Sequence, residues 1–337
     1  MSTHDPHSHP VPLGVSASLL CRCAGEIGFD RFIRGNLHIL MPNTAKTSEL
    51  DAILEDEADR QNFLTAGLLQ LSFGNYPWYD AGVRYKIAFA QHYLNKVRPD
   101  KVAEFSAALA HFETPSTFQT VSISDFLNRH EFAELQRHNA RLRNETNGVD
   151  ENRLCGRRRF NNYPIFSNFH QRLAGWVTEN VGEKVVPSFS LLAQYGPEGK
   201  LPLHIDSQDS MWTLGVCIER NVDWPIFISN VVQKVPEPTL EEWKHEQVRA
   251  DPRLIFRSFS LAPNQAIFYS ASSQWHYRNA IPDSLKGFFD IIFFQFVPAH
   301  SEVCIKSELW GSYFDCRELA VLHSFFQWKS RLSKAAV

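Results

Sequence analysis

The spacing of hydrophobic residues changes near the middle of the chain. Before residue 150 it is mostly helical: apolar residues recur every three or four positions over 51–71, 88–97 and 102–112, and a further helix is expected through Leu142, with Ser122 or Ser124 as its N-cap. After residue 150, one amphipathic helix over 165–181 is followed by apolar runs of strand length. These runs cover 186–195, 211–219, 225–230, 255–261, 265–270 and 286–297. The pattern predicts an α+β protein with a mainly helical N-terminal region and a β-rich second half.

Polar segments rich in Pro, Gly or Asn indicate where these regions begin and end. The first residues, MSTHDPHSHPVP, contain three His and three Pro and little to bury, so residues 1–14 are expected to be a disordered tail. The polar, Gly- and Asn-rich stretch over 144–164 is the best internal boundary. We therefore expect a helical region over 15–150, a β domain over 151–300, and an extension over 301–337 that ends in a helix over 319–332. The connection over 231–254 has a helical centre over 239–248, and connections of that length are often lids.

Composition excludes several classes of partner. The chain has 337 residues, 44% of them hydrophobic, and a net charge of −3, so it offers no electrostatic argument for binding nucleic acid or an anionic membrane. No run of eighteen apolar residues is present, so a membrane span is not expected. The six cysteines show neither C-x-x-C pairs nor zinc spacing, and no signal-peptide pattern opens the chain. Free thiols in the cytoplasm are the expectation.

The candidate chemistry begins with His204 and Asp206, which are separated by one residue in an extended, apolar context. Side chains two apart in a strand point to the same side, so an imidazole and a carboxylate can reach one point. Such a triplet alone is more often a surface pair or a hydrogen-bonded core pair. His276, which follows a later apolar strand, is the best candidate for a third ligand. Two His and one carboxylate form the facial triad of non-heme Fe(II) oxygenases.

These residues and their order resemble the Fe(II)- and 2-oxoglutarate-dependent oxygenases, particularly the prolyl-4-hydroxylase-like branch. The resemblance covers roughly residues 160–298 and rests on Tyr195, Gly199, His204, Asp206, the Thr213–Leu214 strand, the apolar strand over 266–269, His276, Lys286 ten residues later, and the closing strand to Val297. It implies a double-stranded β-helix, which is a jelly-roll variant, with iron at its open end. His204, Asp206 and His276 would hold the metal, and 2-oxoglutarate and O₂ would take the remaining positions.

The resemblance also implies a reaction. It predicts a dioxygenase that hydroxylates, or otherwise oxidises, an unactivated C–H bond of a small-molecule or amino-acid-derived substrate, with release of succinate and CO₂. Members that halogenate lack the carboxylate ligand, so Asp206 favours hydroxylation, desaturation or ring closure. The residues expected to bind the cosubstrate are Lys286, Tyr195, Arg278 and Thr213. Lys286 would bind the distal carboxylate with Arg278 as its rival, unless Lys286 is simply exposed where its strand begins, and Tyr195 has an alternative role as a core tyrosine.

Two other classes of function remain open from the sequence. One is a cupin-like metalloenzyme that does not use 2-oxoglutarate, and the other is a non-catalytic binding protein on the same barrel. The consecutive Arg157, Arg158 and Arg159 belong either to a solvated loop or to a clamp for a substrate carboxylate or phosphate. The N-terminal region and the C-terminal helix could each mediate a homodimer. Nothing in the residues names the primary substrate.

Overall fold

The computed structural model describes residues 83–320 except 146–147, 152–154, 232–247 and 249, and beyond them Leu322, His323 and Phe326. The chain forms two compact units, one from residues 1–110 and 303–337 and the other from His111 to Glu302. The predicted tail over 1–14, the helix over 51–71, and nearly all of the helical centre over 239–248 lie outside the described residues. The second unit begins before residue 150, so some elements expected in the N-terminal region belong to the β-rich unit.

The described part of the first unit is helical, as the spacing predicts. It contains α5 (Val83–Val97), η1 (Pro99–Lys101), α6 (Val102–Leu109) and α11 (Ser307–Tyr313). Pro99 follows α5 closely, and the residue before a proline is disfavoured in helical conformation, which explains where α5 ends. Phe105 of α6 packs against Trp310 and Phe314, with ring centroids 5.3 and 5.0 Å away. The predicted C-terminal helix is helical where it is described, at residues 319–320, 322–323 and 326.

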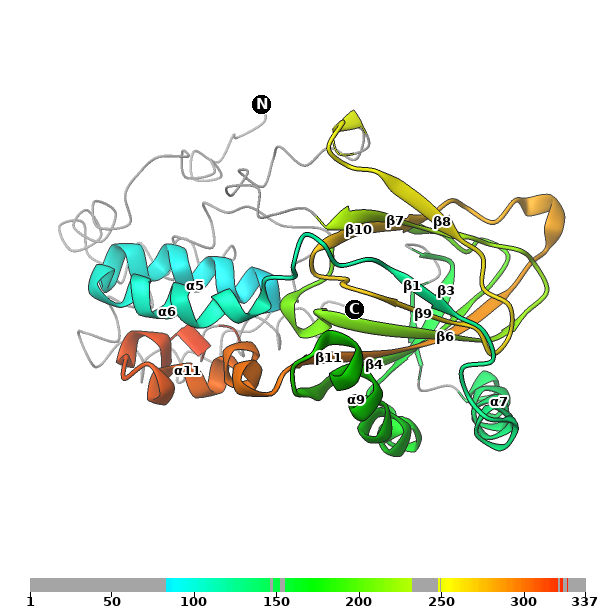
Figure 1. Ribbon diagram of the computed structural model, residues 1–337, viewed down its shortest axis with the longest axis horizontal. Helices are drawn as coiled ribbons and strands as arrows, with labels where there is room; N and C mark the ends of the chain where they lie inside the picture. The colour runs from blue at the N-terminus through cyan, green and yellow to red at the C-terminus, as the bar shows by residue number, and fades with distance from the viewer. Residues whose placement is uncertain are drawn as a thin grey trace, which may run out of the picture. The chain divides into compact units, whose positions relative to one another are not determined.

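Two antiparallel sheets build the second unit (Figure 1). The larger has the strand order β1-β9-β6-β11-β4-β3-β2, and the smaller has the order β5-β10-β7-β8. The strands are β1 (Val121–Ile123), β2 (Val149–Asp150), β3 (Arg157–Asn161), β4 (Val185–Tyr195), β5 (Leu201–His204), β6 (Trp212–Arg220), β7 (Ile226–Val231), β8 (Phe256–Phe259), β9 (Ala266–Tyr269), β10 (Gln274–Arg278) and β11 (Phe289–Pro298). From β4 to β11 the chain changes sheet at nearly every connection, which is the arrangement of a jelly roll.

The sheets enclose one apolar interior. Leu191 of β4, Ile291 of β11 and Ile228 of β7 belong to the same buried cluster, so residues from both sheets meet there. Alternate positions contribute to it from residue 191 to residue 195 of β4 and from residue 289 to residue 293 of β11, as the period-two rule requires. At Gly215 on β6, a side chain would meet the ring of Phe293 at 2.8 Å, so the close packing of the interior requires glycine there.

Helices α7 (Arg129–Arg143) and α9 (Ser167–Val181) pack against the large sheet (Figure 1). Helix α9 confirms the helix predicted over 165–181, and it ends at Gly182, whose φ of 76° is the left-handed conformation that terminates many helices. The predicted N-cap of α7 is wrong. Asn128 caps this helix in a reciprocal arrangement with Glu131, because the segment containing Ser122 forms β1 and pairs with β9 instead.

A buried polar network lies between α7 and the large sheet. The carboxylate of Asp290, on β11, accepts hydrogen bonds from Asn139 at 2.6 Å and from Arg143. Burial raises the pKa of Asp290 to about 6 despite these partners. Arg158 donates to the carbonyl oxygens of Leu142 and Arg143, in the last turn of α7, and of Glu145 just beyond it, where carbonyl groups lack the partners that the helix interior supplies. Arg158 therefore stabilises a helix terminus, a role that its sequence neighbours do not share.

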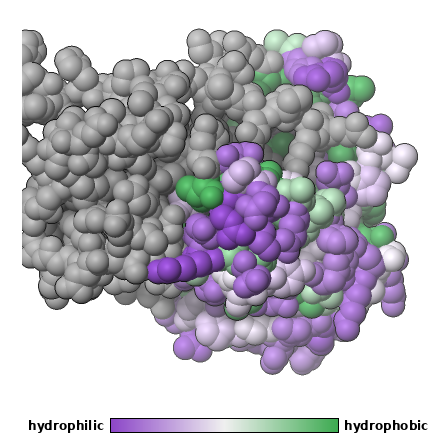
Figure 2. All heavy atoms as spheres, turned by 90° about the vertical axis from the view of Figure 1, so that its left-hand side faces the viewer, coloured by the Kyte–Doolittle hydropathy of each residue, from purple (hydrophilic) through white to green (hydrophobic). Residues whose placement is uncertain are grey.

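The six predicted strands all form, with ends that differ by no more than a few residues. The prediction of a polar boundary over 144–164 misses β2 and β3, which extend the large sheet beyond β4. Cys155, Cys217, Cys304 and Cys316 are free and buried, whereas Cys21 and Cys23 lie outside the described residues. Within the part of the chain that the structure describes, none of the helices has the length and apolar character that a bilayer span requires. The coloured surface in Figure 2 is mostly hydrophilic, with hydrophobic residues scattered over it.

Candidate metal centre

The two histidines singled out by the sequence face each other across paired strands. Strands β5 and β10 run antiparallel, and His204 stands directly opposite His276 in their register. The centroids of the two imidazole rings are 4.2 Å apart. His276 is buried, with 2% of its side chain exposed, whereas 21% of the His204 side chain is exposed. The pair therefore lies where the interior of the jelly roll reaches solvent.

Asp206 completes the cluster from the segment that follows β5. Its backbone N–H donates to the carbonyl of Ala271 at 2.9 Å, which holds the segment against the turn between β9 and β10. Its Oδ1 atom lies 3.3 Å from Nε2 of His204 and 3.9 Å from Nε2 of His276. One ligand atom from each residue lies within 4.8 Å of the other two. Residues far apart in the sequence thus offer two nitrogens and one oxygen to a single point.

Backbone carbonyls fix the orientation of both imidazoles. Nδ1 of His204 is 2.7 Å from the carbonyl of Pro202, and Nδ1 of His276 is 3.0 Å from the carbonyl of Gln274. An Nδ1–H that donates to a carbonyl leaves Nε2 as the nitrogen with a lone pair, which is the arrangement found in metal-binding histidines. Both Nε2 atoms point at the Asp206 carboxylate. A metal ion placed between the two Nε2 atoms and the Asp206 carboxylate could therefore bind all three groups.

The electrostatics favour the protonation states that a metal requires. Burial, followed by the charge of His204, lowers the pKa of His276 to about 4, so this imidazole is neutral at pH 7. Burial alone would raise the pKa of Asp206, but its interactions with His204 and His276 outweigh burial and lower it. Metal binding needs neutral imidazole and ionised carboxylate. The donor set, two imidazoles and one carboxylate on one side of a point, fits Fe(II).

Arg278, two residues beyond His276 on β10, carries a buried guanidinium inside the jelly roll. Its Cζ lies 4.7 Å from the ring centroid of Trp224 and 4.4 Å from that of Phe289. Nη1 donates to the carbonyl of Trp224, whereas Nη2 is buried without a hydrogen-bond partner in the described structure. Burial lowers the pKa of Arg278 to about 10, which still leaves it charged at neutral pH. A buried charged donor without a partner is costly unless a ligand supplies the acceptor.

Two tyrosines accompany this guanidinium. Tyr195, at the end of β4, is buried, and its hydroxyl oxygen accepts a hydrogen bond from Nη1 of Arg157 at 2.8 Å. Its own hydroxyl proton is therefore free to point elsewhere. Tyr269, on β9, is buried with its ring centroid 5.2 Å from that of His276, and so links the interior to the metal ligands.

Thr213 and Lys286, the other candidates for binding the cosubstrate, lie in different surroundings. Thr213 is buried on β6, but its hydroxyl already donates to the carbonyl of Ser210 at 2.9 Å. Lys286 was expected to open the last strand inside the barrel, and that placement is wrong. Strand β11 begins at Phe289, and Lys286 is exposed on the turn before it with a φ of 42°. The predicted strand begins too early because Phe288, which lies before β11, extends the apolar run toward Lys286.

Sequence reasoning missed the roles of Gln274 and Tyr269, and it named Arg157 only as part of a basic cluster. Gln274 holds the turn before His276, Tyr269 contacts the His276 ring, and Arg157 contacts Tyr195. The alternation within RRRFN separates Arg157 and Arg159 from Arg158, because in a strand the first two share one face, but it does not show that Arg157 contacts Tyr195.

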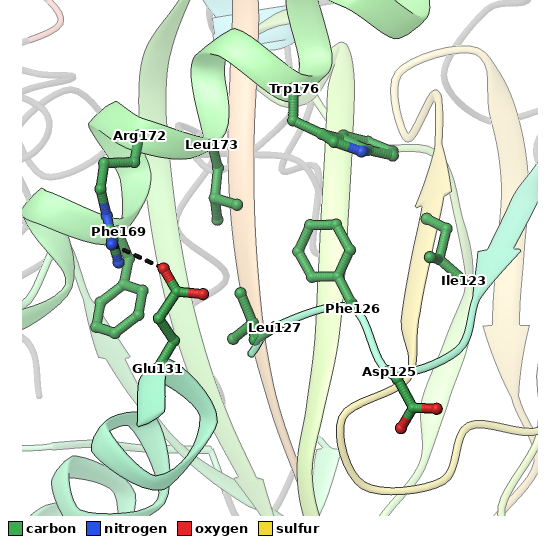
Figure 3. A pocket seen from close by; sticks show the side chains of 9 residues that line it. All are labelled: Ile123, Asp125, Phe126, Leu127, Glu131, Phe169, Arg172, Leu173 and Trp176. Carbon is green, nitrogen blue, oxygen red and sulfur yellow. Dashed lines mark hydrogen bonds and ion pairs between the residues drawn. The ribbon is translucent and has the colours of Figure 1, made fainter. Parts of the chain in front are cut away.

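A separate groove of about 320 Å³ lies outside the jelly roll, between α9 and the segment joining β1 to α7 (Figure 3). None of the three metal-ligand candidates lines it. Two of its charged residues already pair with each other, since Nη1 of Arg172 is 2.8 Å from Oε1 of Glu131. The ring of Phe126 meets Trp176 edge-on at 5.4 Å across the groove. The groove therefore has no part in the chemistry of the metal centre.

Comparison with known proteins finds similarity in structure only. No family model and no curated protein matches the chain. The α-ketoglutarate-dependent epimerase SnoN from nogalamycin biosynthesis is 13% identical with a TM-score of 0.42, over 58% of this chain and 82% of that one. HygX from Streptomyces hygroscopicus, with nickel and 2-oxoglutarate bound, is 13% identical with a TM-score of 0.42, over 58% of this chain and 87% of that one. A Pseudomonas putida prolyl-4-hydroxylase is 10% identical with a TM-score of 0.39, over 58% of this chain and 98% of that one.

Similarity at this level assigns neither a family nor an activity. A further structure of SnoN contains Fe³⁺, α-ketoglutarate and nogalamycin RO. The functional argument has to rest on the residues of this chain, of which His204, Asp206 and His276 form a cluster able to hold a metal ion.

Proposed function

We propose that this chain is an Fe(II)- and 2-oxoglutarate-dependent oxygenase that oxidises an unactivated C–H bond of a small molecule and releases succinate and CO₂. One observation supports the proposal most strongly: the jelly roll contains both a His-Asp-His cluster and, two residues beyond His276 on the same strand, the buried, incompletely partnered guanidinium of Arg278. A metal-binding protein without a dicarboxylate ligand has no need for the second feature.

His204, Asp206 and His276 would hold the iron. Three protein ligands leave three positions open on a six-coordinate metal, enough for a bidentate 2-oxo acid and one further ligand. Bound iron and 2-oxoglutarate together supply the chemistry, in which O₂ oxidises the cosubstrate to succinate and CO₂ and the substrate at a C–H bond. The remaining steps belong to the residues of the chain.

Arg278 would bind the distal carboxylate of 2-oxoglutarate. Residues two apart on a strand are separated by about 7 Å along it, so the guanidinium is displaced from the metal ligands into the interior by a distance suited to a short dicarboxylic acid. The carboxylate would accept a hydrogen bond from Nη2, the nitrogen that lacks a partner. Tyr195 would donate to the same carboxylate, because its oxygen already accepts from Arg157.

The apolar walls would exclude water from this interior. Trp224 and Phe289 flank the guanidinium, and Ile228 and Ile291 belong to the same buried cluster. Exclusion of water would strengthen the charge-assisted contact to Arg278 and limit side reactions with solvent. Because Lys286 is exposed, it does not serve as the basic residue that the resemblance places on the late strand. Membership of the prolyl-4-hydroxylase-like branch is therefore a hypothesis. The choice of hydroxylation over desaturation or ring closure is a hypothesis as well.

Succinate formation by the full-length chain tests the proposal. We expect the purified protein, supplied with Fe(II), ascorbate and air, to convert 2-oxoglutarate to succinate slowly even without a primary substrate. Omission of iron, or the Asp206→Ala substitution, should abolish this turnover, and Asp223→Asn, which changes an exposed carboxylate, should not. Absence of 2-oxoglutarate binding to the Fe(II)-loaded protein would contradict the proposal. Metal-dependent oxidation of substrates without 2-oxoglutarate would favour the cupin-like alternative.

A further inference from the structure

Strand β3 places two arginines on the inner face of the large sheet. In its antiparallel pairing with β4, Arg157 lies opposite Tyr195 and Arg159 lies opposite Ala193. Tyr195 and Ala193 both belong to the buried cluster between the sheets. Arg157 and Arg159 therefore face the same side as that interior, whereas Arg158 faces α7.

A single carboxylate neutralises this pair. Glu151 places Oε2 2.6 Å from Nε of Arg157 and Oε1 2.8 Å from Nε of Arg159. Two guanidinium groups and one carboxylate leave a net charge of +1. A second nitrogen of Arg157, Nη1, donates a hydrogen bond to the hydroxyl oxygen of Tyr195. For Arg159, the contact through Nε is an ion pair without the geometry of a hydrogen bond, and no other ion pair or hydrogen bond of its side chain is found among the described residues, so its two Nη groups remain as donors.

The backbone around these side chains is held in place. The N–H of Glu151 donates to the carbonyl of Arg157, and the N–H of Gly196 donates to that of Gly156, both at 2.9 Å. Gly156 has a φ of 62°, and a Cβ there would lie 2.2 Å from the carbonyl oxygen of Glu198. Only glycine fits between the two segments. Because Glu151 and this turn orient Arg159 in advance, an anion binding to it loses less conformational entropy.

We propose that the primary substrate carries a carboxylate group, and that Arg159 binds it through its Nη groups. This inference rests on the proposed oxygenase function and adds the chemical class of the substrate. Arg159 has 30% of its side chain exposed, so a ligand entering from solvent can reach it, whereas the Arg157 side chain is 13% exposed and committed to Tyr195. The net charge of +1 left by the two arginines and Glu151 balances a monoanionic carboxylate but not a phosphate dianion. Arg pairs with carboxylates through two parallel hydrogen bonds.

Ligand-observed NMR tests this inference without turnover. The full-length protein is loaded with Zn(II), which is redox-inert, and a constant concentration of 2-oxoglutarate. The probes are acetate, benzoate and phenylacetate, each compared with its primary amide, together with phenyl phosphate. We expect at least one carboxylate to bind in preference to its amide and to the phosphate. Arg159→Gln should weaken that binding about tenfold or more, while Arg257→Gln, which changes an exposed arginine on β8, should leave it unchanged.

Several outcomes would overturn the inference. No preference for any acid over its amide would show that the arginines only brace the β2–β3 turn. A carboxylate preference that survives in Arg159→Gln would place the anion site elsewhere. If Arg159→Gln weakens 2-oxoglutarate binding instead, the cluster belongs to the cosubstrate. The comparison of each acid with its amide in the wild-type protein shows whether a carboxylate is preferred, even if Arg159→Gln does not fold. In that case Arg159→Lys, which keeps the charge, serves as the second variant. Failure of the oxygenase proposal would appear separately, as absence of succinate formation.

Discussion

His204 and His276 stand opposite each other on β5 and β10, each with Nδ1 near the carbonyl oxygen of the residue two positions before it on its own strand. The same local contact therefore orients both imidazoles toward Asp206. Because a strand backbone holds each ring, the metal-binding geometry exists before a metal arrives. The affinity of the site should then depend on the ligands themselves more than on any rearrangement.

The first prediction concerns metal binding. Replacing Asp206 with Ala should weaken the binding of Fe(II) or Co(II) more than about 100-fold, since changes in groups that merely orient ligands already lower metal affinity by about 10–100-fold. The partly exposed Asp206 lies outside the apolar core, so the melting temperature of the apoprotein should change little. Equilibrium dialysis of Co(II), with His300→Ala as an exposed control, measures the effect. Undiminished Co(II) binding by Asp206→Ala would exclude this carboxylate as a ligand.

A second prediction separates Arg278 from Lys286 as the anchor of the cosubstrate. A charge-assisted contact contributes about 1.5–3 kcal/mol, and about 1.4 kcal/mol corresponds to tenfold in affinity. Arg278→Met should therefore weaken 2-oxoglutarate binding about 10- to 100-fold, and Arg278→Lys should restore only part of it, because the Lys ammonium keeps the charge but lacks the planar fork of the guanidinium. Lys286→Met should leave binding unchanged. Anaerobic titration of the Fe(II) protein with 2-oxoglutarate measures all three, and an effect confined to Lys286→Met would reverse the assignment.

Local patterns predict most of the jelly roll but not the surroundings of its interior. Of the strands from β4 to β11, all but β5 and β10 follow from apolar runs and turns, and the three ligand candidates follow from spacing and order. What the sequence does not reveal is register. Nothing local shows that His204 pairs with His276, or that β3 joins β4 and turns Arg157 toward Tyr195. For Lys286 the sequence suggests a role that the structure does not support. Its separation of ten residues from His276 suits a cosubstrate anchor, but the chain has not yet entered β11 at that point.

The third prediction concerns stability and pH. Asp290 has a folded-state pKa of about 6, above its ordinary value of 3.8, so its contribution to stability is present below about pH 4 and is lost as the pH rises through 6. The shift corresponds to about 3 kcal/mol. Asp290→Asn, a neutral analogue of the protonated acid, should gain stability relative to the wild type by up to that amount between pH 4.5 and pH 7.5. Urea unfolding at several pH values measures this difference, and a difference independent of pH would contradict the assignment.

The last prediction concerns Gln274, whose side chain joins three segments around the metal centre. Oε1 accepts from the N–H of Ser270 at 2.8 Å, and Nε2 donates to Thr120 at 3.0 Å and to the carbonyl of Ser229 at 2.7 Å. The Gln274 carbonyl also faces Nδ1 of His276. Gln274→Leu keeps the volume but leaves buried polar groups without partners, each costing about 1–3 kcal/mol.

We therefore expect Gln274→Leu to lower the free energy of unfolding by about 3 kcal/mol or more. It should also weaken Co(II) binding by about 10-fold, because the turn that leads into β10 and His276 loses its hydrogen bonds. The matched control is Gln119→Leu, which changes an exposed glutamine with one long hydrogen bond of 3.4 Å to Arg257. Chemical unfolding and Co(II) dialysis on both variants make the comparison. A stability loss with unchanged Co(II) affinity would show that Gln274 supports the fold but does not orient His276.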